Sequence, residues 1–180
     1  SMPDIAMKPN RRLLLFLPLA HVFARYMQFF CFAGNVSLGL SSNLKTILAD
    51  FKAFKPTFIL AVPRIFEKIY NAASQKAGAG FKGRVFADAT QTAYDWSHAQ
   101  QSGGSIPLAL NAKHALYNKL VYSSIMEVFG GHVEYAVSGG APLDSSIAHF
   151  FNGVGLPLLE GYGMTETCAP SSVNPTEGYK

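Results

Sequence analysis

An aromatic ring, a hydroxyl and a carboxylate follow one another in a short glycine-containing stretch near the end of the sequence. Tyr162 stands between Gly161 and Gly163, and Thr165 and Glu166 follow shortly after. A ring between glycines can stack on a base, a hydroxyl can bond a phosphate, and a carboxylate can hold Mg²⁺ against that phosphate. These are the side chains that phosphoryl chemistry needs. The stretch could equally be a loop in which Thr165 or Glu166 caps a helix.

A second cluster, Ser138–Pro142, places Gly139 and Gly140 where the chain must turn from a strand into a helix, with Ala141 and Pro142 after them. Without side chains at the glycines, a planar ring or a phosphate could approach the backbone closely. An ordinary tight turn is the alternative, because glycine is common at such junctions. The spacing is not G-x-G-x-x-G, which disfavours a nucleotide-dependent oxidoreductase.

A third candidate is His21, which lies between an apolar run and an apolar helical stretch. The alternative to a role in a binding site is a core histidine whose ring hydrogen-bonds a backbone carbonyl. The nearby phenylalanines, among them Phe23, Phe29 and Phe30, could line an apolar tunnel or simply form the core.

Short apolar runs alternate with stretches of helical periodicity. The strands and helices that this pattern predicts must position the three clusters. The runs predict strands over 13–17, 36–40, 57–62, 133–137 and 156–159. The periodicity predicts helices from about residue 22, over about 44–54 with caps from 41–43, after Pro63, from 81 to the polar stretch at 100–105, over about 112–129 and after Asp144. The residues from about 78 to 130 contain no predicted strand and are interpreted as a helical insertion.

Strands separated by helices predict an α/β fold with a mainly parallel, doubly wound sheet and helices on both faces. In such sheets ligands bind at the carboxyl ends of the strands. All three clusters follow predicted strands. We therefore expect His21, Ser138–Pro142 and Gly161–Glu166 to meet at one edge of the sheet.

Composition narrows the class of protein. With 49% hydrophobic and 14% charged residues, the 180-residue chain can bury a core. Its net charge of +4 is scattered without runs of like charge, which argues against a nucleic-acid partner. Two cysteines, Cys31 and Cys168, lie far apart in the sequence, which favours a reduced, cytoplasmic compartment over a disulfide scaffold.

Residues 13–33 are apolar enough to be considered for a membrane span, but Pro18, His21 and Arg25 interrupt them. Charge near the centre of a span is costly in lipid, so we predict a buried strand that runs into a buried helix. A lipid-binding or membrane-surface module without catalytic activity remains the alternative from another functional class.

Four collinear motifs together resemble the adenylate-forming enzymes, with the long-chain fatty acyl-CoA synthetases as the closest branch. The motifs are LPLAHVF at 17–23, KPT and VPRIFEKIY within 55–70, SGGAPL at 138–143 and EGYGMTET at 160–167. The resemblance extends from about residue 12 to 179. It implies that 12–180 form part of the large N-terminal, AMP-binding domain, and residues 1–11 are interpreted as a tag remnant and leader.

The resemblance implies an ATP-dependent long-chain fatty acid–CoA ligase. Enzymes of this family join a carboxylate to the α-phosphate of Mg-ATP, release pyrophosphate, and then transfer the acyl group to the thiol of coenzyme A. The ligands would be a fatty acid, ATP, Mg²⁺ and coenzyme A, in the cytoplasm and with peripheral membrane contact left open. The upstream phosphate loop and the downstream ribose-binding acid and lid lysine of the family have no match here, so we expect a central fragment that is inactive alone.

Residue roles are carried over by motif. Catalytic roles fall to His21, beside the reacting carboxylate, to Thr165, on the α-phosphate, and to Glu166, as the ligand of Mg²⁺. The nucleotide site would comprise Gly139, Gly140, Ala141, Pro142, Gly161, Tyr162, Gly163 and Thr165, with Tyr162 beside the adenine. Arg25, Gly140 and Gly161 would line or gate the fatty-acid tunnel.

Overall fold

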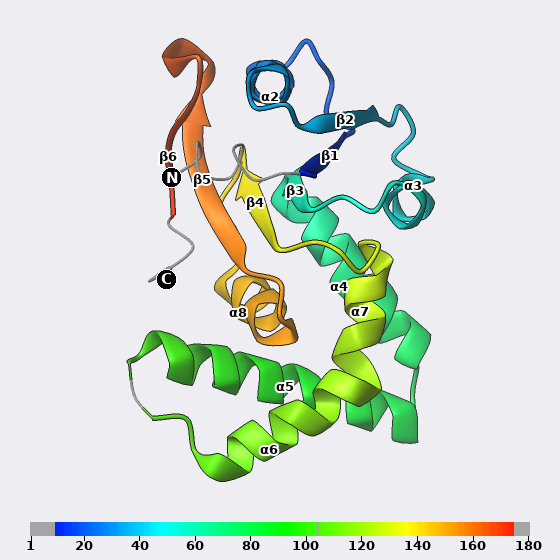
Figure 1. Ribbon diagram of the computed structural model, residues 1–180. Helices are drawn as coiled ribbons and strands as arrows, with labels where there is room; N and C mark the ends of the chain where they lie inside the picture. Colours follow the sequence, from blue (N-terminus) through cyan, green and yellow to red (C-terminus); the bar gives the residue numbers. More distant parts are fainter. Residues whose placement is uncertain (1–9, 104, 175–180) are drawn as a thin grey trace.

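A computed structural model describes residues 10–103 and 105–174, which fold around one six-stranded sheet (Figure 1). The strands are β1 Arg12–Leu15, β2 Ser37–Leu40, β3 Phe58–Ala61, β4 Tyr135–Gly139, β5 Leu158–Met164 and β6 Ala169–Val173. Their order across the sheet is β2-β1-β3-β4-β5-β6. All neighbours run parallel except β5 and β6, which are antiparallel. The predicted mainly parallel α/β sheet is confirmed.

Helices connect the strands and form most of the remaining described chain. They are α2 Val22–Ala33, α3 Ile47–Phe54, α4 Pro63–Ala77, α5 Phe81–Gln101, α6 Leu108–Tyr117, α7 Ser123–Val128 and α8 Ser145–Val154. A π-helical segment, η1 Asn118–Tyr122, joins α6 to α7, and a short 3₁₀ turn, η2 Thr165–Thr167, joins β5 to β6. Between β3 and β4 the described chain forms the helices α4 to α7 and no strand. The two strands are nevertheless neighbours in the sheet, although they lie far apart in sequence.

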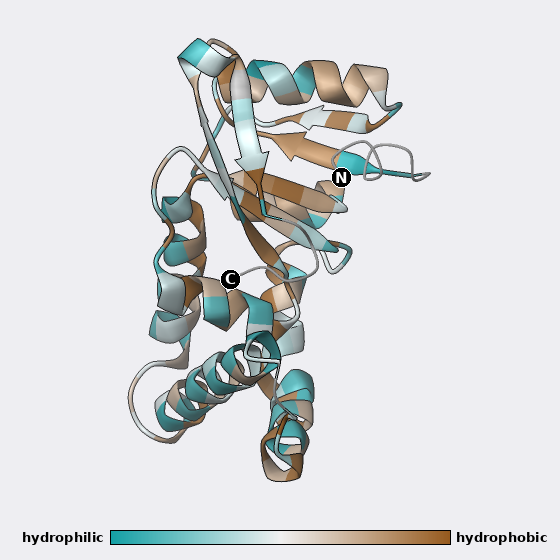
Figure 2. Cartoon of the chain, turned by 90° about the vertical axis from the view of Figure 1, so that its left-hand side faces the viewer, coloured by the Kyte–Doolittle hydropathy of each residue, from teal (hydrophilic) through white to brown (hydrophobic). Residues whose placement is uncertain are grey.

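Alternate residues of the strands face two separate hydrophobic cores, because successive side chains of a strand point to opposite faces. On one face, Leu13, Phe58 and Val137 pack with Met27 and Cys31 of α2. On the other face lies the larger core, to which α3, α4, α5, α7 and α8 contribute. Figure 2 shows the central strands as the hydrophobic middle of the molecule. Helices therefore cover both faces of the sheet, as predicted.

Residues 12–33 form a strand followed by a helix, as the sequence indicated. The helix α2 is only partly buried: Met27 and Cys31 face the core, whereas Phe29 is 63% and Phe32 66% exposed. Burial raises the pKa of the Cys31 thiol to about 11. Within residues 10–103 and 105–174, every helix is too short or too polar to cross a membrane.

Three predicted elements differ most from the structure. The strand predicted to end at residue 159 continues to Met164 as β5 and pairs with β6, which was not predicted. The helix α3 begins at Ile47 rather than near residue 44, and its first turn receives no side-chain cap from residues 41–43. The single helix expected over 112–129 is divided into α6, η1 and α7, and its first part begins at Leu108.

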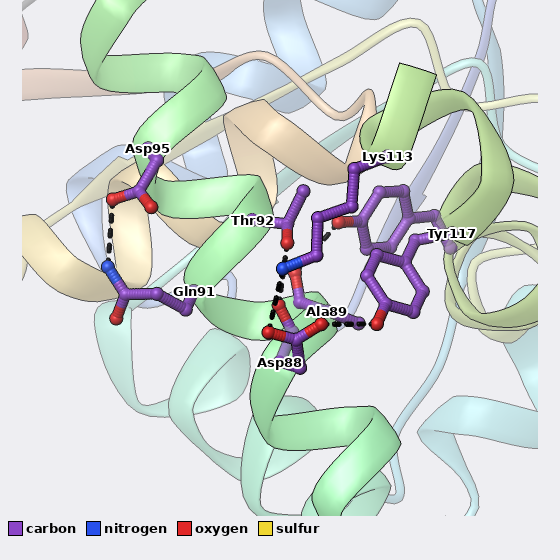
Figure 3. Close-up of polar contacts among 8 residues, drawn as sticks. Asp88, Ala89, Gln91, Thr92, Asp95, Lys113 and Tyr117 are labelled. Carbon is purple, nitrogen blue, oxygen red and sulfur yellow. Dashed lines mark hydrogen bonds and ion pairs between the residues drawn. The ribbon is translucent and has the colours of Figure 1, made fainter. Parts of the chain in front are cut away.

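Polar contacts and a close backbone approach hold α5 against α6 and α8. Asp88 of α5 accepts a hydrogen bond from Lys113 Nζ at 2.8 Å and another from the hydroxyl of Tyr117 (Figure 3). The hydrogen bond from Lys113, followed by that from Tyr117, lowers the pKa of Asp88. At Gly153 of α8 an added Cβ would come within 2.1 Å of the carbonyl oxygen of Ala93 in α5. The two helices can therefore approach this closely only with glycine at 153.

Candidate functional site

The three predicted clusters meet at one cavity of about 250 Å³, on the sheet face that α2 covers. β4 and β5 supply its wall at their carboxyl ends, and the first turn of α2 lies across from them. The predicted site residues in its lining are His21, Gly139, Gly140, Gly161, Tyr162, Gly163, Thr165 and Glu166. The expectation that these segments share one edge of the sheet is thus met.

Gly139, Gly140 and Gly161 form one side of the cavity, called here the glycine wall, and α2 packs directly on it. Gly139 pairs with Gly161 across β4 and β5. A Cβ at Gly139 would lie 3.2 Å from the Phe23 ring and 3.3 Å from the carbonyl oxygen of Gly161. Gly140 has a φ of +83°, a conformation that side-chain-bearing residues rarely adopt. Side chains at these positions would therefore displace Phe23 or strain the turn.

The Gly161–Met164 segment is a strand rather than the loop suggested by its glycines. It pairs with β6 and contains an irregularity in register between Tyr162 and Gly163. Tyr162 is 64% exposed, so its ring is available to a planar ligand beside the glycine wall. A β-bulge re-aims side chains near functional sites, and here it separates Tyr162 from the turn that follows.

The 3₁₀ turn η2 begins with Thr165 and Glu166, whose side chains are exposed at the cavity rim. Thr167 fixes the turn: its Oγ1 accepts from the Met164 amide at 3.3 Å and donates to the Met164 carbonyl at 3.0 Å. The alternative in which Thr165 or Glu166 caps a helix therefore does not apply, since Thr167 makes the capping contacts.

His21 caps α2 and is exposed, so the alternative of a buried core histidine does not hold. Its Nδ1 accepts a hydrogen bond from the backbone N–H of Phe23 at 3.2 Å. In the neutral ring an accepting Nδ1 leaves the proton on Nε2. The ring can therefore donate a hydrogen bond from Nε2 to a ligand in the cavity.

Three predicted residues lie outside the cavity lining. Ala141 and Pro142 follow the glycine wall in an exposed turn, which Glu160 fixes by accepting a hydrogen bond from the Leu143 amide at 3.2 Å. Arg25 is exposed on α2 and donates to Gln28 Oε1 at 2.9 Å.

Four residues that line the cavity were assigned no site role from the sequence, although the first three lie within its motifs: Val22, Phe23, Met164 and Pro170. The sequence indicates Phe23 only as one of several phenylalanines that could line an apolar tunnel or form the core. Its contact with Gly139 joins residues distant in sequence, so the local pattern held no signal for it. Pro170 lies on β6, which was not predicted at all.

The charged side chains in the lining suit a nucleotide-bound metal better than a metal held by protein alone. Glu166 is the single carboxylate among the lining residues. Among the residues that the structure describes, no group of three or more His, Cys, Asp and Glu could hold an ion. Mg²⁺ is typically bound by one or two carboxylates together with substrate phosphates. The donor set therefore fits Mg²⁺ that arrives with a phosphate ligand.

A mainly parallel sheet with a glycine-walled cavity at the carboxyl ends of its strands is typical of the nucleotide-binding α/β proteins. Within that class, the chain belongs to the AMP-binding enzyme family, whose model matches residues 2–180. The resemblance to adenylate-forming enzymes is confirmed.

The curated relatives include fatty acid–CoA ligases. Long-chain-fatty-acid–CoA ligase FadD15 of Mycobacterium tuberculosis is 48% identical over 161 residues, which cover 89% of this chain and 27% of the relative. Long chain acyl-CoA synthetase 3 of Arabidopsis thaliana is 33% identical over 163 residues, which cover 89% and 24%. The chain therefore spans about a quarter of the length of these relatives.

Solved structures share the fold at lower sequence identity. The adenylation domain of a carboxylic acid reductase from Segniliparus rugosus, in complex with AMP and a co-purified carboxylic acid, matches with a TM-score of 0.59 and 22% identity, over 96% of this chain and 24% of that one. O-succinylbenzoate CoA synthetase of Bacillus subtilis, with an acyl-adenylate intermediate, matches with a TM-score of 0.59 and 15% identity, over 97% and 25%.

Proposed function

We propose that this chain is the central part of an ATP-dependent long-chain fatty acid–CoA ligase of the cytoplasm. The observation that carries the proposal is the convergence of His21, the glycine wall and the Gly161–Glu166 segment on one cavity. A cavity of about 250 Å³ is smaller than pockets that enclose a whole ligand. We infer that it holds the reacting centre of an acyl-adenylate, and that other segments of a longer protein complete the site.

In the proposed first step, a carboxylate oxygen of the fatty acid attacks the α-phosphorus of ATP, and the bond to pyrophosphate breaks. The chain's contribution is to position two anions and to stabilise charge. Tyr162 would stack on the adenine beside the glycine wall, and Thr165 would hydrogen-bond the α-phosphate. His21 would donate from Nε2 to the acyl carboxyl group.

Glu166 would hold Mg²⁺, which when bound offsets the repulsion between the carboxylate and the phosphates. The thiol of coenzyme A would then attack the acyl carbonyl carbon and release AMP. Gly140 and Gly161 would border the acyl tunnel, and a gating role for Arg25 would require its side chain to leave Gln28.

Glu166→Gln in the full-length protein tests the assignment, because it removes the charge and keeps the shape of the side chain. We expect ATP–pyrophosphate exchange driven by palmitate to fall by about 100-fold or more, because Mg²⁺ would be held less well against the negative charge of the phosphates in the transition state. Raising the Mg²⁺ concentration should recover part of the activity.

Glu127→Gln is the matched control, because Glu127 is an exposed glutamate on α7 and lies outside the cavity lining. It should leave the exchange rate unchanged. Undiminished exchange in the Glu166→Gln protein would contradict the assigned role.

A second candidate, a module that binds a membrane surface without catalysis, is favoured by the exposed Phe29 and Phe32 on α2. Apolar side chains on the outer face of a helix can insert into the lipid interface. Co-sedimentation with liposomes that disappears in Phe29→Ser/Phe32→Ser, with no response to ATP, would support this candidate.

A further inference from the structure

A large apolar hollow lies on the sheet face opposite the proposed active site. This α4–α5 groove has a volume of about 750 Å³ and is lined by residues of α3, α4, α5, η1 and α7. Its floor includes the buried Ile69, Phe86 and Ile125. No lining residue is shared with the cavity at Gly139 and Gly161.

Small side chains create the hollow, and large exposed ones border it. Ala72, Ala73 and Ala77 of α4 line the groove between the larger side chains of Ile69 and Lys76, which leaves space above the middle of this helix. Phe81 at the start of α5 is 82% exposed, and Leu120 of η1 is 62% exposed. Surface aromatic and aliphatic side chains gathered at a concave apolar surface are typical of ligand-binding sites.

The π-helical segment η1 is what brings Leu120 and Val121 to the groove. A π-turn adds a residue to the helix and shifts the face that the following residues present. π-turns occur frequently at functional sites, so this irregularity is an observation independent of the groove's shape. α6 before it contains no buried residue, whereas α7 after it packs Ile125 into the core.

Charge is concentrated at one end of the groove. Lys76, in the last turn of α4, and Lys82, in the first turn of α5, are the charged residues of its lining, and both are exposed. Neither forms an ion pair with a residue that the structure describes. The connection between them, Gly78–Gly80, lies at the lower right in Figure 1 and has positive φ at Gly78 and Gly80.

The amide groups of the first turn of α5 lie at the same end. The N-cap Gly80 offers them no side-chain acceptor, so they add to the positive potential there. An apolar groove with two lysines and free helix amides at one end is complementary to a long apolar chain with one anionic head.

We propose that the α4–α5 groove is a second lipid site that binds one free long-chain fatty acid as its anion. The carboxylate lies between Lys76 and Lys82, and the acyl chain extends over Ala73 towards Ile125. The site is separate from the proposed catalytic cavity, and its existence does not depend on the proposed activity.

Photo-crosslinking tests the placement. A palmitate analogue with a diazirine near its chain end, used below its micelle concentration, should label η1 and α7 of the 180-residue chain and of the full-length protein. Isothermal titration with palmitate gives the affinity. Lys76→Glu/Lys82→Glu should weaken binding by about tenfold or more, because the carboxylate then meets two negative charges. Ala73→Trp should abolish labelling of α7 by filling the groove.

Lys45→Glu/Lys52→Glu is the matched control, because it makes the same charge change at exposed lysines outside the groove. It should bind palmitate as the parent chain does. Circular dichroism melting identifies any variant that has lost its fold, and the charge reversals lie on the surface.

Three results would overturn the proposal. Labelling confined to Phe23 and β5 would place the fatty acid in the catalytic cavity. Equal affinity for palmityl alcohol would remove the role of the lysines. Loss of labelling in the full-length protein, or a concentration-dependent dimer that Ala73→Trp disrupts, would show that protein covers the groove. The ATP–pyrophosphate exchange assay is independent of all three.

Discussion

At the scale of single residues, the neutral form of His149 contributes to the packing of α8 on α5. Its Nδ1 lies 3.1 Å from Oγ of Ser97, which is 1% exposed. The ring also contacts Tyr94, at 4.8 Å between centroids, and lies 5.7 Å from the ring of His98. Burial, and to a smaller extent His98, lowers the pKa of His149.

This lowered pKa makes stability depend on pH. The unfolded chain binds a proton at His149 more readily than the folded chain does. The contribution of neutral His149 to the free energy of unfolding is therefore fully present above the ordinary pKa of 6.5. It should fall as the pH drops below that value towards the folded pKa. Urea unfolding at pH 7.5 and pH 5.5 measures the difference.

His149→Gln should reduce this pH dependence, because glutamine does not titrate and can still hydrogen-bond Ser97. His132→Gln, at an exposed histidine, is the matched control and should keep the dependence of the parent chain. An equal slope in both variants would contradict the role of His149.

At the scale of helices and strands, the close approach of α5 and α8 depends on Gly153. Its carbonyl oxygen also accepts a hydrogen bond from His114 Nε2 at 2.5 Å, so α6 is tied to the same point. The ring of His114 stacks on Trp96 of α5, with 4.3 Å between centroids. Three helices therefore share one contact, which a single methyl group would disturb.

Gly153→Ala should lower the free energy of unfolding by about 3 kcal/mol, because the methyl group overlaps backbone atoms that cannot rotate away. Chemical denaturation measures the loss. Ser145→Ala, at the exposed first residue of α8, is the control and should change stability by less than about 0.5 kcal/mol. A stability loss no greater than that of the control would mean that α5 and α8 move apart freely.

Elements with a strong local pattern were predictable. The buried runs at β1, β3 and β4 and the helix after Asp144 follow from apolar periodicity, and Asp144 accepts from the amides of Ser146 and Ile147 as a helix cap should. β6 and the extension of β5 were not, because glycine, proline and serine there give no strand pattern. Their strand conformation comes from pairing with each other.

The site was predictable in part for the same reason. Each glycine cluster carried its own signal, and the parallel sheet implied that they meet. The contact of Phe23 with Gly139 and the place of Pro170 depend on how α2 and β6 pack. Such tertiary contacts leave no periodic trace in one sequence.

At the scale of the whole molecule, aromatic side chains join the helices of the larger core. Phe151 of α8 is fully buried and contacts Phe66 of α4 at 5.6 Å and Phe129, which follows α7, at 6.0 Å between ring centroids. Its neighbour Phe150 packs against it at 5.2 Å. Phe151 therefore joins the beginning and the end of the long helical segment that runs from α4 to α7.

Phe151→Ala should lower the free energy of unfolding by about 3–5 kcal/mol, through lost burial and the cavity left behind. The melting temperature should fall accordingly, and calorimetry measures it. Phe32→Ala, at a residue 66% exposed, is the matched control and should melt close to the parent chain. Equal melting temperatures would show that the larger core repacks around the cavity.

The direct pairing of β3 with β4 also bears on how the chain folds. Phe58 stands opposite Tyr135, and everything between α4 and α7 must be ordered or looped out before the two strands can join. Closing so long a loop costs conformational entropy in advance of any contact it gains. Compact helical structure from α4 to α7 shortens the span, so we expect the helices to form early and the pairing of β3 with β4 to form late. Gly139 and Gly161 pair across β4 and β5, so this pair can form first, and the late step is then the one that brings Phe23 of α2 against it.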